Sequence, residues 1–337
     1  MASKLYSMSS SERISRGARL LFRAMRPRYD ALHLPEKHFT PEGFEYHIYY
    51  PSGKAFRTVI LIYGMTIEGK DDPRLIKFAR SCASVGLKVV VPDLPGLMDF
   101  LVQEDDMRRL EAITWIVGNE GAEKIGLIGF STGGSYALLL AGHPTLRELI
   151  GPLVLFSPIY DVRAVADYLH APFEPPPATE KDWDQYYWSQ YVITLRNCRH
   201  LGLSEAVQDG LKILLADYEK YQLEVKRIFY DNHVAPLKLV GRTDLFHEGE
   251  ILDRLSAQGQ LKSVKSPVFI LHDASDHLVP PDQSRRMVSE LARRGAGFRQ
   301  KVLVTPWLSH VTMKNFGSPA ELFQIISYIS ELFRVAS

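Results

Sequence analysis

The sequence predicts an α/β fold, in which a mostly parallel central sheet is flanked by helices and carries a helical insertion. Short apolar segments alternate with helical segments as far as residue 156, and this spacing is typical of a parallel α/β sheet. The alternation stops for about a hundred residues and resumes at residue 267, which indicates an insertion into one α/β domain. The expected parts are a basic amphipathic N-terminal arm (residues 1–30), the core (residues 40–160 and 265–337) and a helical cap insertion (residues 161–264).

The strands are predicted from apolar runs that end in turn residues. Residues 57–63 (RTVILIY) are continuously apolar, as expected of a strand that is covered on both faces. The apolar run at residues 125–128 precedes a glycine-serine turn and a helix of small residues. Further strands are expected at residues 42–50, 87–91, 153–156, 267–271 and 300–304, and helices at about residues 73–85, 104–117, 204–218, 219–230, 248–255 and 319–333.

The composition is ordinary for a globular protein, with 46% hydrophobic and 23% charged residues in a chain of 337. The formal net charge of +1, without an extended basic-aromatic module, gives no indication of nucleic-acid binding. The two cysteines, Cys82 and Cys198, provide neither a disulfide framework nor zinc-ligand spacing, which suits a reducing compartment. No run approaches about 18 apolar residues, and the start lacks an apolar signal-peptide core, so we expect a cytoplasmic protein.

The N-terminal arm is strongly basic and has helical periodicity that ends near Pro27. We expect an amphipathic helix that packs its apolar side on the domain. Contact with a membrane surface, as in a peripheral lipase, and an organelle transit peptide are the alternatives. The basic residues are Lys4, Arg13, Arg16, Arg19, Arg23, Arg26 and Arg28, and the apolar residues at helical spacing are Ile14, Ala18, Leu21 and Met25.

Residues 129–133 (GFSTG) match the pattern G-x-S-x-G of a nucleophile elbow. In such an elbow a serine stands on a strained turn between a strand and a helix, so its neighbours need to be small. Ser131 is therefore the candidate nucleophile. The helix that follows directs its unpaired N–H groups at the same place, and the N–H of Thr132 is a candidate donor to an oxyanion.

A serine nucleophile needs a base to take its proton and an acid to orient that base. Ligands of open α/β sheets lie beyond the carboxyl ends of the strands, so polar residues at those ends are candidates. Asp276 and His310 each follow one of the strands predicted after the insertion. The chain order Ser131, Asp276, His310 is the order associated with a nucleophile elbow.

With these residues in place, the chain resembles the capped, esterase- and lipase-like serine hydrolases of the α/β-hydrolase superfamily. That family commonly has a glycine, two variable residues, the acid and a closing Val-Pro at the later strand end. Residues 273–280 (DASDHLVP) follow this pattern, with Asp273 at the glycine position, and the match favours Asp276 as the acid. The alternative acids are Asp273 and, because some members of the family carry the acid after an earlier strand, Asp161. The resemblance covers about residues 42–151 and 265–333.

The same resemblance implies the rest of the oxyanion hole. The family often has His-Gly and a third residue in the loop after the strand predicted at residues 57–63. Here the tripeptide is Tyr63-Gly64-Met65, so the second donor implied is the N–H of Met65, and Tyr63 replaces the histidine. Residues 92–96 (PDLPG) also resemble a superfamily segment, in which Asp93 would hold the loop.

The expected activity is hydrolysis of a small-molecule carboxylic ester through an acyl-enzyme, with no metal and no organic cofactor. Ser131 would attack, His310 would serve as base and then acid, and Asp276 would fix the imidazole. Aminopeptidase or amidase, carbon–carbon bond hydrolase, thioesterase and acyltransferase activities are alternatives on the same triad, and so is a ligand-binding protein without turnover. The GFSTGG segment also resembles the elbow of cofactor-free haloperoxidases and perhydrolases.

Substrate contacts are expected from the elbow, from the loop after residues 57–63 and from the insertion. The insertion carries an aromatic cluster at residues 183–191, which is either a pocket wall or packing between cap and core. It offers no clear charged anchor, which favours an apolar or aromatic acyl or alcohol group. A peptidase remains an alternative, because acids that could bind a substrate ammonium group lie near the cluster: Glu174, Glu180, Asp182 and Asp184. The candidate substrate contacts are Tyr63, Gly64, Phe130, Trp183 and Trp188.

Overall fold

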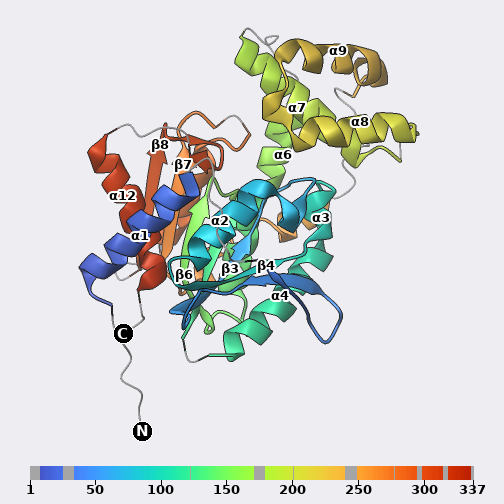
Figure 1. Ribbon diagram of the computed structural model, residues 1–337. Coiled ribbons are helices and arrows are strands. Elements are labelled where there is room, and N and C mark those ends of the chain that lie inside the picture. The colour runs from blue at the N-terminus through green and yellow to red at the C-terminus, as the bar shows by residue number, and fades with distance from the viewer. Residues whose placement is uncertain are drawn as a thin grey trace.

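The centre of the molecule is a sheet of eight strands (Figure 1). The strands are β1 (Glu36–Phe39), β2 (Glu45–Tyr49), β3 (Arg57–Ile62), β4 (Leu87–Pro92), β5 (Ile125–Phe130), β6 (Ile150–Phe156), β7 (Val268–Asp273) and β8 (Gln300–Thr305). The computed structural model describes residues 8–25, 34–121, 123–170, 179–199, 201–239, 249–276, 278–293, 298–313 and 318–334.

The strand order is β1-β2-β4-β3-β5-β6-β7-β8. β2 pairs antiparallel with β1 and β4, and all pairs from β4 to β8 are parallel. The predicted fold class, a mostly parallel sheet flanked by helices, is confirmed. Every predicted strand is present, with its ends within three residues of the expected ones. β1 was not predicted, because its polar sequence EKHF lies largely exposed at the edge of the sheet and has no alternating apolar pattern.

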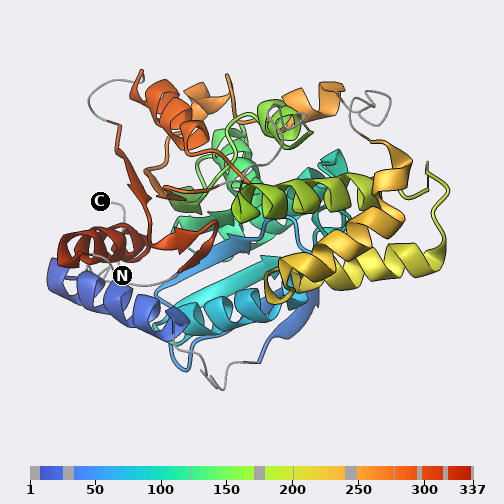
Figure 2. The ribbon, with the colours of Figure 1, turned by 90° about the horizontal axis from the view of Figure 1, so that it is seen from above.

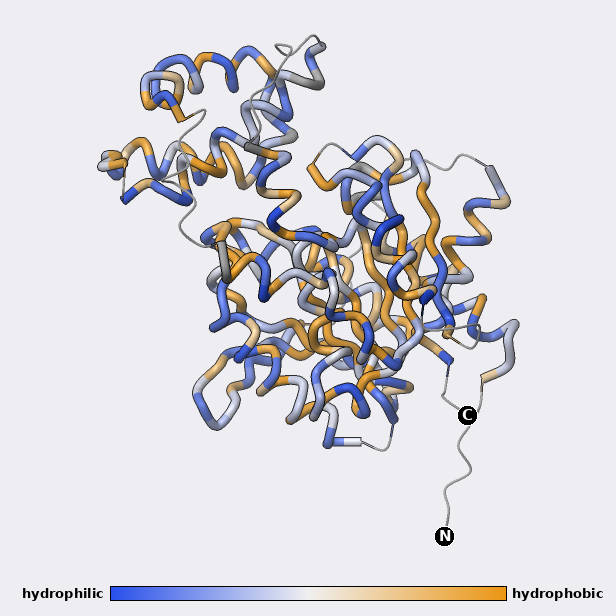
Figure 3. The backbone as a smooth tube through the Cα atoms, turned by 180° about the vertical axis from the view of Figure 1, so that it is seen from behind, coloured by the Kyte–Doolittle hydropathy of each residue, from blue (hydrophilic) through white to orange (hydrophobic). Residues whose placement is uncertain are grey.

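Helices cover both faces of the sheet. α1, α2 and α12 lie together on one face, and α5 and α11 lie on the other (Figures 1 and 2). The helices of the core are α1 (Ser10–Met25), α2 (Pro73–Ala83), α3 (Pro95–Met98), α4 (Glu104–Asn119), α5 (Thr132–Gly142), α11 (Asp282–Ala292) and α12 (Pro319–Ser330). Apolar residues are concentrated along the central strands (Figure 3), as a sheet covered on both faces requires.

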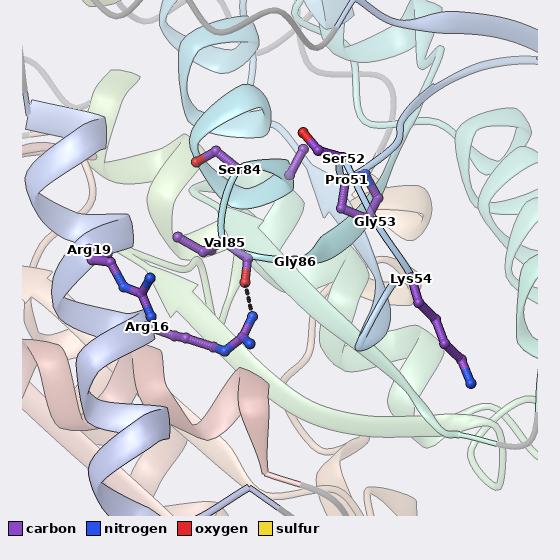
Figure 4. A pocket seen from close by; sticks show the side chains of 10 residues that line it. Arg16, Arg19, Pro51, Ser52, Gly53, Lys54, Ser84, Val85 and Gly86 are labelled. Carbon is purple, nitrogen blue, oxygen red and sulfur yellow. Dashed lines mark hydrogen bonds between the residues drawn. The ribbon is translucent and has the colours of Figure 1, made fainter. Parts of the chain in front are cut away.

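The basic N-terminal segment contains the helix α1, which packs its apolar side on the domain. Leu20 and Leu21 are buried in the main hydrophobic core. Arg16 Nη1 donates to the carbonyl oxygen of Val85 over 2.6 Å (Figure 4), so this arginine is bonded to the main chain at the end of α2 and is not simply solvated. Within the described ranges, no helix combines the length and apolarity needed to cross a bilayer.

The predicted insertion contains α6 (Val162–His170), α7 (Glu180–Arg196), α8 (Glu205–Ala216), α9 (Leu223–His233) and α10 (Gly249–Arg254). α7, α8 and α9 stand apart from the sheet at the upper right of Figure 1. They enclose a second hydrophobic cluster, the cap cluster: Phe100, Tyr187, Tyr191, Ile193, Leu195, Leu211, Leu214, Leu215, Tyr218, Val234 and Leu239. The buried residues of α6 and α10 belong to the main core, so the cap cluster includes only part of the insertion at residues 161–264. The predicted proline-rich connector at 171–178 lies outside the described residues.

Candidate active site

Four polar residues meet at the carboxyl edge of the sheet. Ser131 follows β5, Ser157 follows β6, Asp273 ends β7, and His310 follows the two-residue strand β9 (Leu308–Ser309). β5, β6 and β7 are parallel neighbours, so their carboxyl ends lie side by side. Five described non-glycine residues have a positive φ, and three of them are at this edge: Ser131, Ser157 and His310. Strained backbone of this kind gathers at functional sites.

Ser131 stands between β5 and α5 with φ 51° and ψ −122°. Its N–H donates to the carbonyl oxygen of Phe156 over 2.9 Å, which ties the turn to the neighbouring strand β6. The turn is too tight for a side chain at Gly129, where a Cβ would lie 2.7 Å from the carbonyl oxygen of Gly133. The elbow predicted from G-x-S-x-G therefore has the expected place between a strand and a helix.

The loop after β3 runs directly beside Ser131. A Cβ on Gly64 would lie 2.9 Å from the Cβ of Ser131 and 3.6 Å from its hydroxyl oxygen, so only glycine allows this approach. Met65 comes next, and its side chain packs against both the main core and the cap cluster. Neither the N–H of Met65 nor that of Thr132 has an acceptor among the described residues. Two free N–H groups near a serine are what an oxyanion hole needs.

Asp276 and His310 are joined by a hydrogen bond of 2.7 Å between Oδ2 of the carboxyl group and Nδ1 of the ring. The other carboxyl oxygen accepts from the N–H groups of Leu278 and Val279 over 3.0 and 2.9 Å. Burial by itself would raise the pKa of Asp276. The charge and hydrogen bond of His310 and the Val279 N–H outweigh burial and hold this pKa well below its usual range. Asp276 is thus an ionised carboxylate that orients the imidazole.

The two alternative acids have other partners. Asp273 accepts from the main-chain N–H of His310 over 3.0 Å and does not bind the ring. Asp161 accepts from the N–H of Ala164 over 2.9 Å and lies 3.3 Å from a guanidinium nitrogen of Arg286. Of the three acids weighed from the sequence, Asp276 alone is bonded to the imidazole.

No hydrogen bond joins the Ser131 hydroxyl to the His310 ring in the described part of the chain. The structure thus brings the predicted base and the predicted acid into contact, and it places Ser131 at the same sheet edge without a hydrogen bond to the ring. Bonds between nucleophile and base are often long until a substrate is bound. The side chain of His310 is 19% exposed, so it is in contact with solvent.

A second histidine lies close to Asp276. His272 is fully buried, with Nε2 2.9 Å from the carbonyl oxygen of Val279 and Nδ1 2.6 Å from the hydroxyl of Ser284. Burial lowers the pKa of His272, which favours the neutral ring. His272 is therefore a satisfied core residue. No group of three or more His, Cys, Asp or Glu side chains in the described ranges is arranged to hold a metal ion.

Tyr63 and Asp93, two further residues singled out in the sequence, make structural contacts around the loop after β4. Tyr63 is 2% exposed, and its hydroxyl accepts from the N–H of Leu94 over 2.7 Å. Its hydroxyl thus holds the loop after β4, and the predicted contact of Tyr63 with a substrate stays a prediction. Asp93 belongs to the same loop and accepts from Lys70 Nζ over 2.8 Å, as expected for a structural residue.

The other aromatic candidates lie in packed groups. Phe130 stacks on Phe156, with ring centroids 4.8 Å apart. Trp183 packs on Tyr187 within α7, with ring centroids 5.5 Å apart. Trp188 faces Phe100 edge-on at 6.4 Å, and this contact joins the cap to the loop after α3. Trp188 is therefore placed at the junction of cap and core, whereas Trp183 packs within the cap.

Ser157 and Asp273 were not predicted in the roles that the structure gives them. Ser157 Oγ donates to the carbonyl oxygen of His310 over 2.7 Å, and Asp273 accepts from its N–H. A signal existed for both: Ser157 is a polar residue directly after a buried strand, and Asp273 replaces the glycine of the family pattern.

Comparisons with known proteins place the chain among solved structures of one fold. No family model matches the sequence, and a search of curated proteins found no match. The chain is similar to a candidate hydrolase from Legionella pneumophila subsp. pneumophila str. Philadelphia 1, with 16% identity, 95% of this chain and 94% of that chain covered, and a TM-score of 0.52. It is also similar to an acylaminoacyl peptidase in complex with Z-Gly-Gly-Phe-chloromethyl ketone, with 13% identity, coverage of 87% and 44%, and a TM-score of 0.50.

A third similar structure is an acylaminoacyl peptidase of Pyrococcus horikoshii, with 15% identity, coverage of 81% of this chain and 37% of that chain, and a TM-score of 0.46. The chain spans less than half of the length of these peptidases. At such identities the likeness concerns the fold.

Proposed function

Because this chain has the α/β-hydrolase fold, we propose that it is a serine hydrolase that cleaves carboxylic esters through an acyl-enzyme. Ser131 is the nucleophile, His310 the base, and Asp276 the acid that orients the base. The N–H groups of Met65 and Thr132 form the oxyanion hole. The observation that carries this proposal is the 2.7 Å bond between His310 and the buried Asp276, at the edge of the sheet where Ser131 occupies a strained elbow.

In the first half-reaction, the Ser131 hydroxyl oxygen attacks the ester carbonyl carbon while His310 takes the hydroxyl proton. The carbonyl oxygen becomes negative and is held by the two N–H groups. His310 then gives its proton to the departing alkoxide, and the alcohol leaves. Water repeats these steps on the acyl-enzyme, releases the carboxylic acid and restores Ser131. Asp276 stabilises the imidazolium in both halves.

An ester with an apolar acyl or alcohol group is the substrate class that the surroundings support. Met65 packs between the main core and the cap cluster, and Trp188 and Phe100 meet nearby at the same junction. A peptidase acting on free amino termini would need an acid for the ammonium group. Asp184, one of the acids expected to serve this purpose, is bound to Lys226 Nζ over 2.6 Å. This pairing leaves Asp184 less available to bind an ammonium group.

Labelling with a fluorophosphonate probe tests the nucleophile. We expect the wild-type chain to be labelled, Ser131→Ala to lose the label entirely, and His310→Ala to be labelled far more slowly. Ser135→Ala is the matched control, because it also removes a serine hydroxyl near the start of α5. That hydroxyl donates to the carbonyl oxygen of Ile159. Full labelling of Ser131→Ala would refute the assignment.

A substrate panel tests the reaction. Nitrophenyl esters of short and medium acyl chains are compared with aminoacyl nitroanilides, using wild-type protein and Ser131→Ala. We expect Ser131-dependent turnover of the esters and little turnover of the anilides. Preference for the anilides would replace the ester proposal with a peptidase, and labelling without turnover of either would favour another acyl chemistry at the same serine.

A further inference from the structure

The residue proposed as base occupies a strained turn. β9 pairs antiparallel with β10 (Thr312–Met313), and Ser309 lies opposite Thr312. His310 and the residue after it are therefore the two central residues of a hairpin turn. His310 has a φ of 53°, and the first central position of such turns has a positive φ, for which glycine is preferred. A histidine at this position will keep its backbone conformation only if its surroundings hold it there.

We infer that Asp273 and Ser157 are positioning residues for His310, an inference that rests on the proposed function. Asp273 Oδ2 accepts from the main-chain N–H of His310 over 3.0 Å. The Ser157 hydroxyl donates to the main-chain carbonyl oxygen of His310 over 2.7 Å. The two contacts hold the peptide groups on both sides of the His310 α-carbon.

Asp273 and Ser157, which we call the clamp, are themselves held in place. Asp273 is 3% exposed and Ser157 is fully buried. The second oxygen of Asp273 accepts from both the N–H and the hydroxyl of Ser275, over 2.8 and 3.0 Å. The N–H of Asp273 also lies 3.4 Å from the Ser157 hydroxyl oxygen, so the two residues contact each other as well as His310. Three neighbouring segments of chain, after β6, at β7 and after β9, are thereby locked together.

The clamp does something that Asp276 cannot do alone. Asp276 holds one ring atom, Nδ1, and leaves the ring free to move as the turn moves. With the main chain fixed as well, the direction from the α-carbon to the β-carbon is fixed, and with it the place of the other ring nitrogen, Nε2. That nitrogen has to meet the Ser131 proton, and a displacement of about 1 Å of a reacting group can lower a rate about 100-fold.

The test uses the full chain with Ser157→Ala, Asp273→Ala and Asp273→Asn. The readouts are kcat and KM on a nitrophenyl ester, the rate of fluorophosphonate labelling, and the melting temperature of each variant. The two alanine variants remove one clamp contact each, and we expect kcat and the labelling rate to fall roughly 10- to 100-fold while KM stays within about twofold. Asp273→Asn keeps an oxygen that accepts from the His310 N–H, so its kcat should lie clearly closer to wild type than that of Asp273→Ala.

A spectroscopic readout separates positioning from general destabilisation. The proton between Nδ1 of His310 and Asp276 gives a low-field NMR resonance, which we expect to broaden or shift in Ser157→Ala and Asp273→Ala. Ser266→Ala is the matched control: Ser266 is also buried and donates to a main-chain carbonyl, that of Ile150, but at the opposite end of β7. It should leave kcat and the resonance unchanged.

The outcomes are distinct for the two proposals. If His310→Ala or Ser131→Ala keeps wild-type turnover, the proposed function itself fails. If those variants lose turnover while Ser157→Ala and Asp273→Ala keep wild-type kcat, only the clamp is overturned. Equal loss in Asp273→Asn and Asp273→Ala would also overturn it, since the charge of Asp273 and not its hydrogen bond would then be responsible. Should Asp273→Ala fail to fold, Ser157→Ala and Asp273→Asn decide the question.

Discussion

Asp273 and Asp276 hold two different parts of the same residue. Asp276 is bonded to the ring of His310, and Asp273 is bonded to its main-chain N–H. Asp273 is the last residue of β7, Asp276 lies three positions further along the chain, and both are buried. Because one carboxylate can stabilise a charge on the imidazole and the other can only hold the turn, their removal should have different consequences.

Replacing Asp276 should be the more damaging change. In Asp276→Asn the side chain keeps its size but no longer holds the imidazole in the required tautomer or stabilises the imidazolium, so we expect kcat to fall by about 10⁴-fold. The measurement is kcat on a nitrophenyl ester that the wild type cleaves. Asp161→Asn is the control, because Asp161 contacts Ala164 and Arg286 and not His310. A larger loss in the control than in Asp276→Asn would assign the acid to the end of β6.

The elbow should not tolerate a side chain at Gly129. In Gly129→Ala the new Cβ would lie 2.7 Å from the carbonyl oxygen of Gly133 and the same distance from the α-carbon of Gly134. We expect the free energy of unfolding to fall by about 1–3 kcal/mol, as is typical when atoms are forced into a filled space. Fluorophosphonate labelling should fall with it. Gly53→Ala, where the new Cβ would meet no atom within 4 Å, is the control and should change stability by less than about 0.5 kcal/mol.

The sequence was sufficient for the features that depend on local pattern. The elbow at Ser131 is a motif of five residues, and the apolar runs define the strand ends at which Asp276 and His310 were expected. The fold class followed from the alternation of the same segments. Such features need neither the register of the sheet nor the conformation of a particular turn.

What could not be predicted depends on contacts between distant residues. Ser157 and His310 are far apart in the chain, and their hydrogen bond follows from the order of the strands and a positive φ at both residues. The hydrogen bond of Tyr63 could not be predicted either, because it joins two different loops. In the structure its hydroxyl accepts from the N–H of Leu94, on a loop that the sequence does not place beside it.

The N-terminal helix should contribute to stability. Leu20 of α1 is fully buried in the main core, so Leu20→Ala should lower the free energy of unfolding by about 2–5 kcal/mol. Denaturant unfolding provides the measurement. Ser15→Ala, on the exposed side of the same helix, is the control and should have an effect of less than about 0.5 kcal/mol. An unchanged stability in Leu20→Ala, together with binding of the wild type to liposomes, would instead support a membrane-facing helix.

Asp106 should make stability depend on pH in the opposite direction from Asp276. Burial raises the pKa of Asp106 from its ordinary value of 3.8 to about 6, against the effect of hydrogen bonds from the N–H groups of Gly96 and Leu97. Between about pH 4 and pH 6 the folded state therefore holds more of the proton than the unfolded state does, and the free energy of unfolding falls as the pH rises through this window. The loss is complete above about pH 6, and two pKa units correspond to about 3 kcal/mol as an order of magnitude.

Asp106→Asn removes this titration. We expect the free energy of unfolding of wild type minus that of Asp106→Asn to decrease from pH 4 to pH 7, with most of the change before about pH 6. Denaturant unfolding at a series of pH values measures it. Asp105→Asn removes the neighbouring carboxylate of α4, which is bonded to Arg109 at the surface, and controls for the change in net charge. A wild-type-minus-variant difference that stays constant or rises across the window would show that Asp106 is ionised at the same pH in the folded and unfolded chains, or at lower pH when folded.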